Sequence, residues 1–243
     1  TIRLSPNVAT AALDNLMTGI RTKNDQLFAD VDIYSKAAHF LLEFPETFFS
    51  DQGVAQALAV LDQGIERAKQ LQIGASPWVM QKGRKVLGYY SSLDGSVQPM
   101  GVTIPDSYDG SKPVRLYVWL HGRSQTLSEA AFIAGLANPI PRDSTAWTAD
   151  AGQITIDAYG RWNNANHWAG EVDIYEAIQA VQRRFKIDPE RIILRGFSLG
   201  GAGAWHNALH RPGFWVAAEI GAGTWPRRSL VAEQNPQQYP PYQ

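Results

Sequence analysis

The chain of 243 residues has 44% hydrophobic and 19% charged residues, a composition typical of a globular protein with a substantial core. Its formal net charge is −1 and its basic residues are scattered, so we expect no nucleic-acid partner. It has no cysteine, which excludes disulfides, thiolate metal sites and a cysteine nucleophile, and no apolar run approaches the roughly 18 residues of a membrane span. We therefore expect no membrane partner, no metal site and no cofactor.

The N-terminal part of the chain has a helical pattern. Apolar residues recur at helical spacing in three successive segments between residues 6 and 73. Pro6 and Ser50–Asp51 fit helix starts, and Gly74 fits a helix end. We expect residues 1–80 to form a helical extension that packs against a main domain of residues 81–243.

From Lys85 onward the apolar pattern becomes extended. It predicts strands over 85–90, 97–104, 114–120, 153–158 and 215–220. Helices are predicted over 127–136 and after a long loop at 159–168, and Asp188–Pro189 should end the second of these helices before the next strand. Because strands and helices alternate from residue 114 onward, the sequence predicts an α/β fold with a mostly parallel sheet.

The most specific motif is Gly196-Phe197-Ser198-Leu199-Gly200, which follows the short apolar strand 192–194 and leads into a helical pattern. This is the G-x-S-x-G nucleophile elbow in its strand–turn–helix context. Small residues on both sides allow the strained backbone that lifts the serine hydroxyl clear of the sheet. Ser198 is therefore the predicted nucleophile, at a helix N-terminus whose N–H groups favour developing negative charge.

Two backbone N–H groups should hold the oxyanion of an acyl-transfer reaction. One belongs to Leu199, the residue after the nucleophile, and the other should come from the loop after the third strand. That loop reads His121-Gly122-Arg123, and we predict Arg123 as the second donor with Gly122 as the alternative. The His121 side chain is expected to brace the loop.

The same edge of the sheet should hold the substrate, because α/β folds bind ligands at the carboxyl ends of their strands. The loop after the fourth predicted strand supplies Trp162, Asn166 and Trp168 there. We predict these three residues, together with His121, as candidate substrate-binding residues. Simple packing within the loop is the alternative.

Acyl transfer by a serine also needs a general base, and the sequence contains no convincing candidate for it. His206 lies eight residues into the elbow helix, about 12 Å along its axis, and His210 lies farther still. His39 belongs to the helical extension, and only His167 could reach the cleft from its loop. In hydrolases with this elbow, the acid and then the histidine follow the nucleophile along the chain, so we expect both beyond Gln243.

Four segments together resemble secreted bacterial α/β-hydrolases of the prolyl-oligopeptidase-type peptidase and esterase group: Leu120–Arg123, Tyr159–Arg161, Gly170–Asp173 and Arg191–Gly201. The resemblance covers residues 85 to 225 approximately, and the helical N-terminal region is typical of some bacterial members. It implies the α/β-hydrolase fold, a secreted or periplasmic location, and a triad acid and histidine for which this sequence has no counterpart. We therefore expect a partner, a C-terminal fragment of the same precursor that carries Asp and His.

The sequence thus predicts a serine hydrolase that cleaves carboxylic esters through an acyl-enzyme on Ser198. Two alternatives stay open. A serine peptidase of the prolyl-oligopeptidase type would use the same elbow chemistry, although no series of short strands precedes the core as a propeller gate would require. A non-catalytic hydrolase-like protein would keep the fold and bind a ligand or partner in the cleft.

Overall fold

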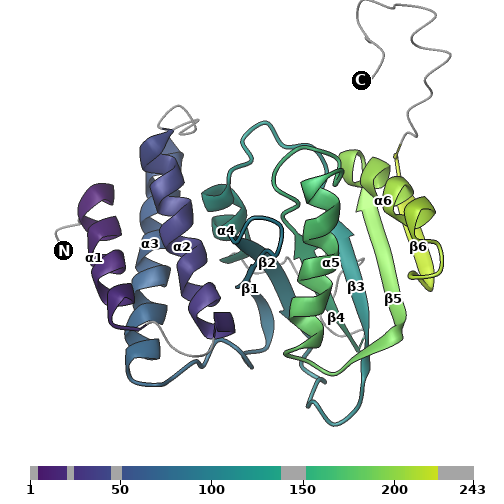
Figure 1. Cartoon of the computed structure of the whole chain (residues 1–243), viewed down its shortest axis with the longest axis horizontal. Helices are drawn as coiled ribbons and strands as arrows, with labels where there is room; N and C mark the ends of the chain where they lie inside the picture. The colour runs from purple at the N-terminus through teal and green to yellow at the C-terminus, as the bar shows by residue number, and fades with distance from the viewer. Residues whose placement is uncertain (1–4, 21–24, 45–50, 138–151, 224–243) are drawn as a thin grey trace, which may run out of the picture.

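The structure, a computed structural model, describes residues 5–20, 25–44, 51–137 and 152–223. Three helices come first: α1 (Pro6–Thr18), α2 (Asp25–Glu43) and α3 (Asp51–Gln72). They lie together at one end of the molecule (Figure 1). The strands that follow are β1 (Gly83–Tyr90), β2 (Val97–Ile104), β3 (Val114–Leu120), β4 (Gln153–Ala158), β5 (Ile187–Phe197) and β6 (Ala217–Gly221). The remaining helices are α4 (Glu129–Ala137), α5 (Ala169–Gln182) and α6 (Leu199–His210).

The strands form one sheet in the order β1-β2-β4-β3-β5-β6. β2 runs antiparallel to both of its neighbours, whereas the β4–β3, β3–β5 and β5–β6 pairs are parallel. The prediction of an α/β fold with a mostly parallel sheet is confirmed. With the Ser198 turn directly after β5, this arrangement is the expected α/β-hydrolase fold with helices preceding it.

Helices cover both faces of the sheet near β1. A β-carbon on Gly88 would lie 2.1 Å from the Ala29 carbonyl oxygen, so α2 packs closely on one face. The next residue, Tyr89, points to the other face, where its hydroxyl donates to the Asp173 carbonyl of α5 at 3.2 Å. Because successive side chains of a strand alternate in direction, α2 and α5 lie on opposite faces.

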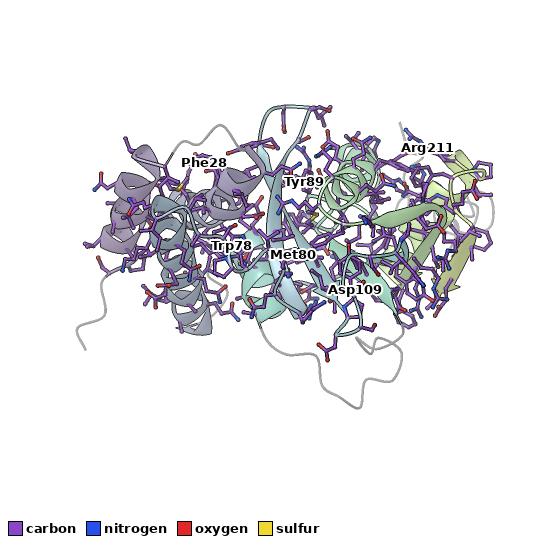
Figure 2. The ribbon with its side chains drawn as sticks, turned by 90° about the horizontal axis from the view of Figure 1, so that it is seen from below. Phe28, Trp78, Met80, Tyr89, Asp109 and Arg211 are labelled. Atoms are coloured by element: carbon purple, nitrogen blue, oxygen red, sulfur yellow. The ribbon has the colours of Figure 1, made fainter. Side chains whose placement is uncertain are left out.

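The N-terminal helices and the sheet share one continuous apolar core, which extends from Leu13 of α1 to Trp215 before β6. A buried ion pair crosses this core: Arg184 donates to both carboxylate oxygens of Asp30 at 2.9 and 2.8 Å. The Trp78 indole donates to the same carboxylate at 2.9 Å, and Figure 2 shows Trp78 between the N-terminal helices and the sheet. The described helices and sheet therefore pack as one unit, and the domain boundary at residue 80 stays a prediction.

The strand before the elbow is longer than the sequence predicted. β5 begins at Ile187 and includes Asp188–Pro189, the dipeptide expected to end the preceding helix, which already ends at Gln182. Its pairing with β3 moves from Val114↔Ile187 to Leu116↔Ile192, so the intervening β5 residues bulge out of the ladder. At such a bulge the missing N–H of Pro189 costs no ladder hydrogen bond. Among the described helices, none combines the length and hydropathy that crossing a membrane requires.

Candidate active site

Ser198 occupies the turn between β5 and α6 with a backbone φ of 56° and ψ of −118°. Such a conformation costs about 1–3 kcal/mol for a residue with a β-carbon. The flanking glycines are required for steric reasons as well as by the motif, because any side chain there would clash with neighbouring backbone. A β-carbon on Gly196 would lie 2.1 Å from the Gly200 carbonyl oxygen, and one on Gly200 would lie 2.0 Å from the Leu120 carbonyl oxygen. The turn leaves the serine exposed, as a nucleophile requires.

Backbone hydrogen bonds to β6 and within α6 stabilise the turn. The Ser198 N–H donates to the Gly221 carbonyl at 2.9 Å, and the Ser198 carbonyl accepts from Ala202 at 3.0 Å inside the first turn of α6. Because both backbone groups are used, the strained conformation is fixed by partners on two elements. The hydroxyl makes no capping hydrogen bond to its own helix.

The loop after β3 lies directly beside the nucleophile. A β-carbon on Gly122 would lie 3.6 Å from the Ser198 β-carbon and 3.5 Å from the Phe197 carbonyl oxygen. In the described part of the chain, no hydrogen bond uses the N–H groups of Gly122, Arg123 or Leu199. The structure thus brings the predicted oxyanion loop and the start of α6 together at Ser198. The choice between Arg123 and Gly122 as second donor stays a prediction.

Side chains tie the oxyanion loop to the loop after β4. The two ring nitrogens of His121 each lie 2.9 Å from a carbonyl oxygen, one of Gly122 and one of Tyr159. Asn163 closes a second link: it accepts from the Ser124 N–H at 3.1 Å and donates to the Ser124 carbonyl at 2.7 Å. His121 therefore contacts backbone within the loops, in agreement with the predicted bracing position.

The loop between β4 and α5 stores unusual backbone strain. Five of its non-glycine residues have positive φ: Arg161, Trp162, Ala165, Asn166 and Trp168. Trp168, at the start of α5, has φ 51° and ψ −120°, nearly the conformation of Ser198. Strain of this kind concentrates at functional sites, where surrounding contacts hold it.

The three predicted substrate residues of this loop have different positions. Trp162 and Trp168 are 54% and 74% exposed, so their rings are available to a ligand. Asn166 is only 2% exposed, and its carbonyl accepts from the Asn207 side chain of α6 at 3.3 Å. The structure therefore places Asn166 in the packing between the loop and α6, away from solvent.

Arg161 fixes the start of the strained loop, a role that the sequence did not reveal. Its guanidinium donates to the buried Asp173 carboxylate of α5 at 2.9 Å, to Asp94 at 2.5 Å and to the Ser91 hydroxyl at 2.8 Å. Burial raises the pKa of Asp173 to about 6, and Arg161 opposes this rise. Asp94 lies in the β1–β2 turn, so only the folded sheet brings it to Arg161.

The histidine side chains contact groups other than Ser198. His39 pairs with Asp14 at 2.8 Å, and His121 contacts the two carbonyls described above. His206 contacts Glu171 at 2.9 Å, and the His167 ring stacks on the His206 ring with centroids 4.0 Å apart. No hydrogen bond in the described ranges joins any of the five histidines to Ser198. That the general base comes from outside these five histidines stays a prediction.

The gathering of Glu171, His206 and His210 was missed by the sequence reasoning, which treated the two histidines only as candidate bases. Their ligand-type atoms all lie within 4.8 Å of one another. The available signal was the spacing of His206 and His210, which puts both on one face of α6. Glu171 lies on a different helix, so sequence spacing could not have added it.

No protein family and no curated protein matches the chain. Among solved structures, it is similar to a thermostable esterase (17% identity, TM-score 0.40, covering 56% of this chain and 40% of that one). It is also similar to the fluorophosphonate-binding serine hydrolase FphF of Staphylococcus aureus (21% identity, TM-score 0.42, covering 57% of this chain and 56% of that one). A prolyl endopeptidase is similar as well (18% identity, TM-score 0.41, covering 57% of this chain and 21% of that one). The aligned part of the chain thus spans less than two thirds of each of these enzymes, and the functional reasoning rests on the geometry around Ser198.

Proposed function

We propose that the protein is a serine hydrolase that cleaves carboxylic esters through an acyl-enzyme on Ser198. The observation that carries the proposal is the exposed, strained Ser198, held by Gly221 and placed beside Gly122 of the loop after β3. The conformation fits a nucleophile because, on a serine that is also exposed, it presents the hydroxyl to a carbonyl carbon.

The chemistry follows from the position of the donors. The Ser198 Oγ attacks the ester carbonyl carbon while a general base accepts its proton, and the carbonyl oxygen becomes an oxyanion. The N–H groups of Leu199 and of Arg123 or Gly122 stabilise that oxyanion, and one such donor is worth about 10²–10³ in rate. Collapse expels the alcohol, which takes the proton from the base, and water then cleaves the acyl-enzyme by the same steps.

We propose that the triad acid and base come from another polypeptide segment, a C-terminal fragment of the same precursor. The engagement of all five histidines elsewhere supports this idea. So does the surface near β6, which is the last strand of the described sheet. Several large apolar side chains are exposed on β5, α6 and the segment before β6: Phe197, Trp205, Leu209 and Val216. A covering polypeptide would remove this apolar surface from water.

Within this proposal the substrate is an ester rather than a peptide, and the paired ester and anilide assays below distinguish the two. The exposed Trp162 and Trp168 would suit an apolar or aromatic group on the ester. A secreted or periplasmic location remains part of the same proposal and rests on the resemblance in the sequence.

The test compares the wild type with Ser198→Ala and with Ser92→Ala as the matched control. Ser92 lies on the β1–β2 turn and is also exposed, but its hydroxyl donates to Glu176 of α5. All three are expressed from the whole precursor and assayed on p-nitrophenyl ester and p-nitroanilide substrates. We expect Ser198→Ala to lower ester turnover at least about thousandfold, while Ser92→Ala behaves as wild type. A fluorophosphonate probe should label the wild type at Ser198.

The alternatives give different results in these assays. Faster cleavage of the anilide than of the ester would favour the peptidase. A folded precursor that neither turns over esters nor reacts with the probe would favour the non-catalytic binding protein. Native mass spectrometry should detect a companion fragment, and a fully active chain of 26.8 kDa by itself would contradict the proposed partner.

A further inference from the structure

A group of metal-ligand side chains lies at the carboxyl end of α6, at the opposite end of that helix from Ser198. Glu171 is in the first turn of α5, and His206 and His210 are one turn apart on α6. Figure 2 shows the neighbouring Arg211 at the end of the molecule away from the N-terminal helices. The Arg211 guanidinium lies 4.0 Å from the Tyr175 ring centroid, so its charge is directed to that ring.

The distances within the group suit a small cation. The Glu171 Oε2 lies 2.9 Å from the His206 Nε2 and 3.5 Å from the His210 Nδ1, and the three ligand atoms lie within 4.8 Å of one another. In a tetrahedral zinc site with bonds of about 2.05 Å, ligand atoms lie roughly 3.3 Å apart. Small side-chain rotations are therefore enough to place all three atoms around one ion.

The electrostatic surroundings also suit a cation. Glu171 brings a carboxylate, whose Oε2 faces both histidine rings. The carboxyl end of α6 adds the negative end of the helix dipole at His210. His206 is backed by the His167 ring, stacked on it at 4.0 Å, and this contact orients the ring toward Glu171.

A hydrogen-bonded ion pair is the simpler explanation for Glu171 and His206 alone. It does not explain the second histidine, whose ring centroid lies 3.7 Å from that of His206 and whose Nδ1 also faces the Glu171 carboxylate. Two histidines and one carboxylate form a ligand set typical of zinc and related divalent transition metals. Hard cations such as Mg²⁺ prefer oxygen ligands.

We propose that Glu171, His206 and His210 bind one divalent transition-metal ion, for which Zn²⁺ is the best fit. The ion would join α5 to α6. Because α5 follows the strained loop with Trp162 and Trp168, and α6 begins after Ser198, the ion would hold two walls of the candidate active site together. Its role is to position these elements, since even His206, the nearer of the two histidines, lies about 12 Å along the helix axis from Ser198.

The test uses the full chain after treatment with EDTA, titrated with Zn²⁺ by calorimetry and with Co²⁺ by visible absorption. We expect one Zn²⁺ per chain, a higher Tm with Zn²⁺ than with Mg²⁺, and the visible bands of tetrahedral Co²⁺. His210→Ala, at an exposed position that should not affect folding, and Glu171→Gln should each lower the Zn²⁺ affinity at least about tenfold.

His39→Ala is the matched control, because His39 also pairs with a carboxylate, Asp14, but has no second histidine beside it. It should leave Zn²⁺ affinity unchanged. Absence of saturable Zn²⁺ binding, or equal binding by His210→Ala, Glu171→Gln and the wild type, would overturn the proposal. Ser198→Ala should bind Zn²⁺ normally, so failure of the metal site and failure of the hydrolase proposal are distinguishable.

Discussion

Replacement of Arg161 by methionine should destabilise the protein by leaving Asp173 without its cation. The wild-type guanidinium donates to the Asp173 Oδ1 at 2.9 Å, and Asp173 is fully buried. Its Oδ2 is buried without a hydrogen-bond partner among the described residues, so no other donor there can replace Arg161. Removal of one partner from a buried pair costs about 3–5 kcal/mol. Methionine keeps the length and apolar stem of the side chain, so packing changes least.

The loss of stability in Arg161→Met should depend on pH, and the pKa of Asp173 determines the direction of that dependence. Burial raises the pKa of Asp173 from 3.8 to about 6 in the folded protein. The folded state therefore holds this proton more tightly than the unfolded chain, and the contribution of Asp173 to the free energy of unfolding is greatest below pH 3.8. It decreases as the pH rises through about 6, by about 3 kcal/mol in total. Without Arg161 the pKa rises further, so the decrease continues at higher pH.

Urea unfolding of the wild type, Arg161→Met and Arg161→Met/Asp173→Asn at about pH 5 and about pH 8 measures this effect. We expect Arg161→Met to lose more stability at the higher pH, and the double variant to regain at least about 1 kcal/mol there. Arg191→Met, which breaks the exposed pair with Asp188, is the matched control and should change stability by less than about 1 kcal/mol. A loss equal at both pH values, or no recovery in the double variant, would refute the reasoning.

Two further substitutions test contacts that the fold requires. Gly200→Ala should cost about 1–3 kcal/mol and slow labelling of Ser198, because its β-carbon would lie 2.0 Å from the Leu120 carbonyl oxygen beside the oxyanion loop. Gly135→Ala in α4 is its control, because a β-carbon there would meet no atom of another described element within 4 Å, and it should be neutral or stabilising in thermal unfolding. Arg184→Met should cost about 3–5 kcal/mol in urea unfolding because Asp30 would be a buried charge without its cation, and a loss no larger than that of Arg191→Met would contradict this.

Much of the fold was predictable because its signals are local. The three N-terminal helices, the alternation of strands and helices, and the elbow around Ser198 all follow from the spacing of apolar residues and from glycines at fixed positions. The full length of β5 was not predictable in this way, because Pro189 is unusual inside a strand and is accommodated there only by the bulge against β3.

The candidate site was predictable only where the motif itself contains the residues. Ser198 and Leu199 belong to the elbow, and Gly122 was inferred from its place after the third strand; the structure sets it beside Ser198. Asn166 was predicted from its loop alone, and nothing local distinguishes it from the exposed Trp162 and Trp168. Its burial arises from α6, which covers it.

By itself, the sequence determined the kinds of elements, their order and the strained serine, because backbone sterics and apolar periodicity act over a few residues. Only the tertiary structure decided which distant groups meet. Arg161 reaches Asp94 across 67 residues, and Arg184 reaches Asp30 across 154. The Glu171–His206–His210 group likewise depends on side chains of two different helices, α5 and α6, meeting in the folded protein. Such contacts depend on the packing of a whole core, which a local pattern of residues does not encode.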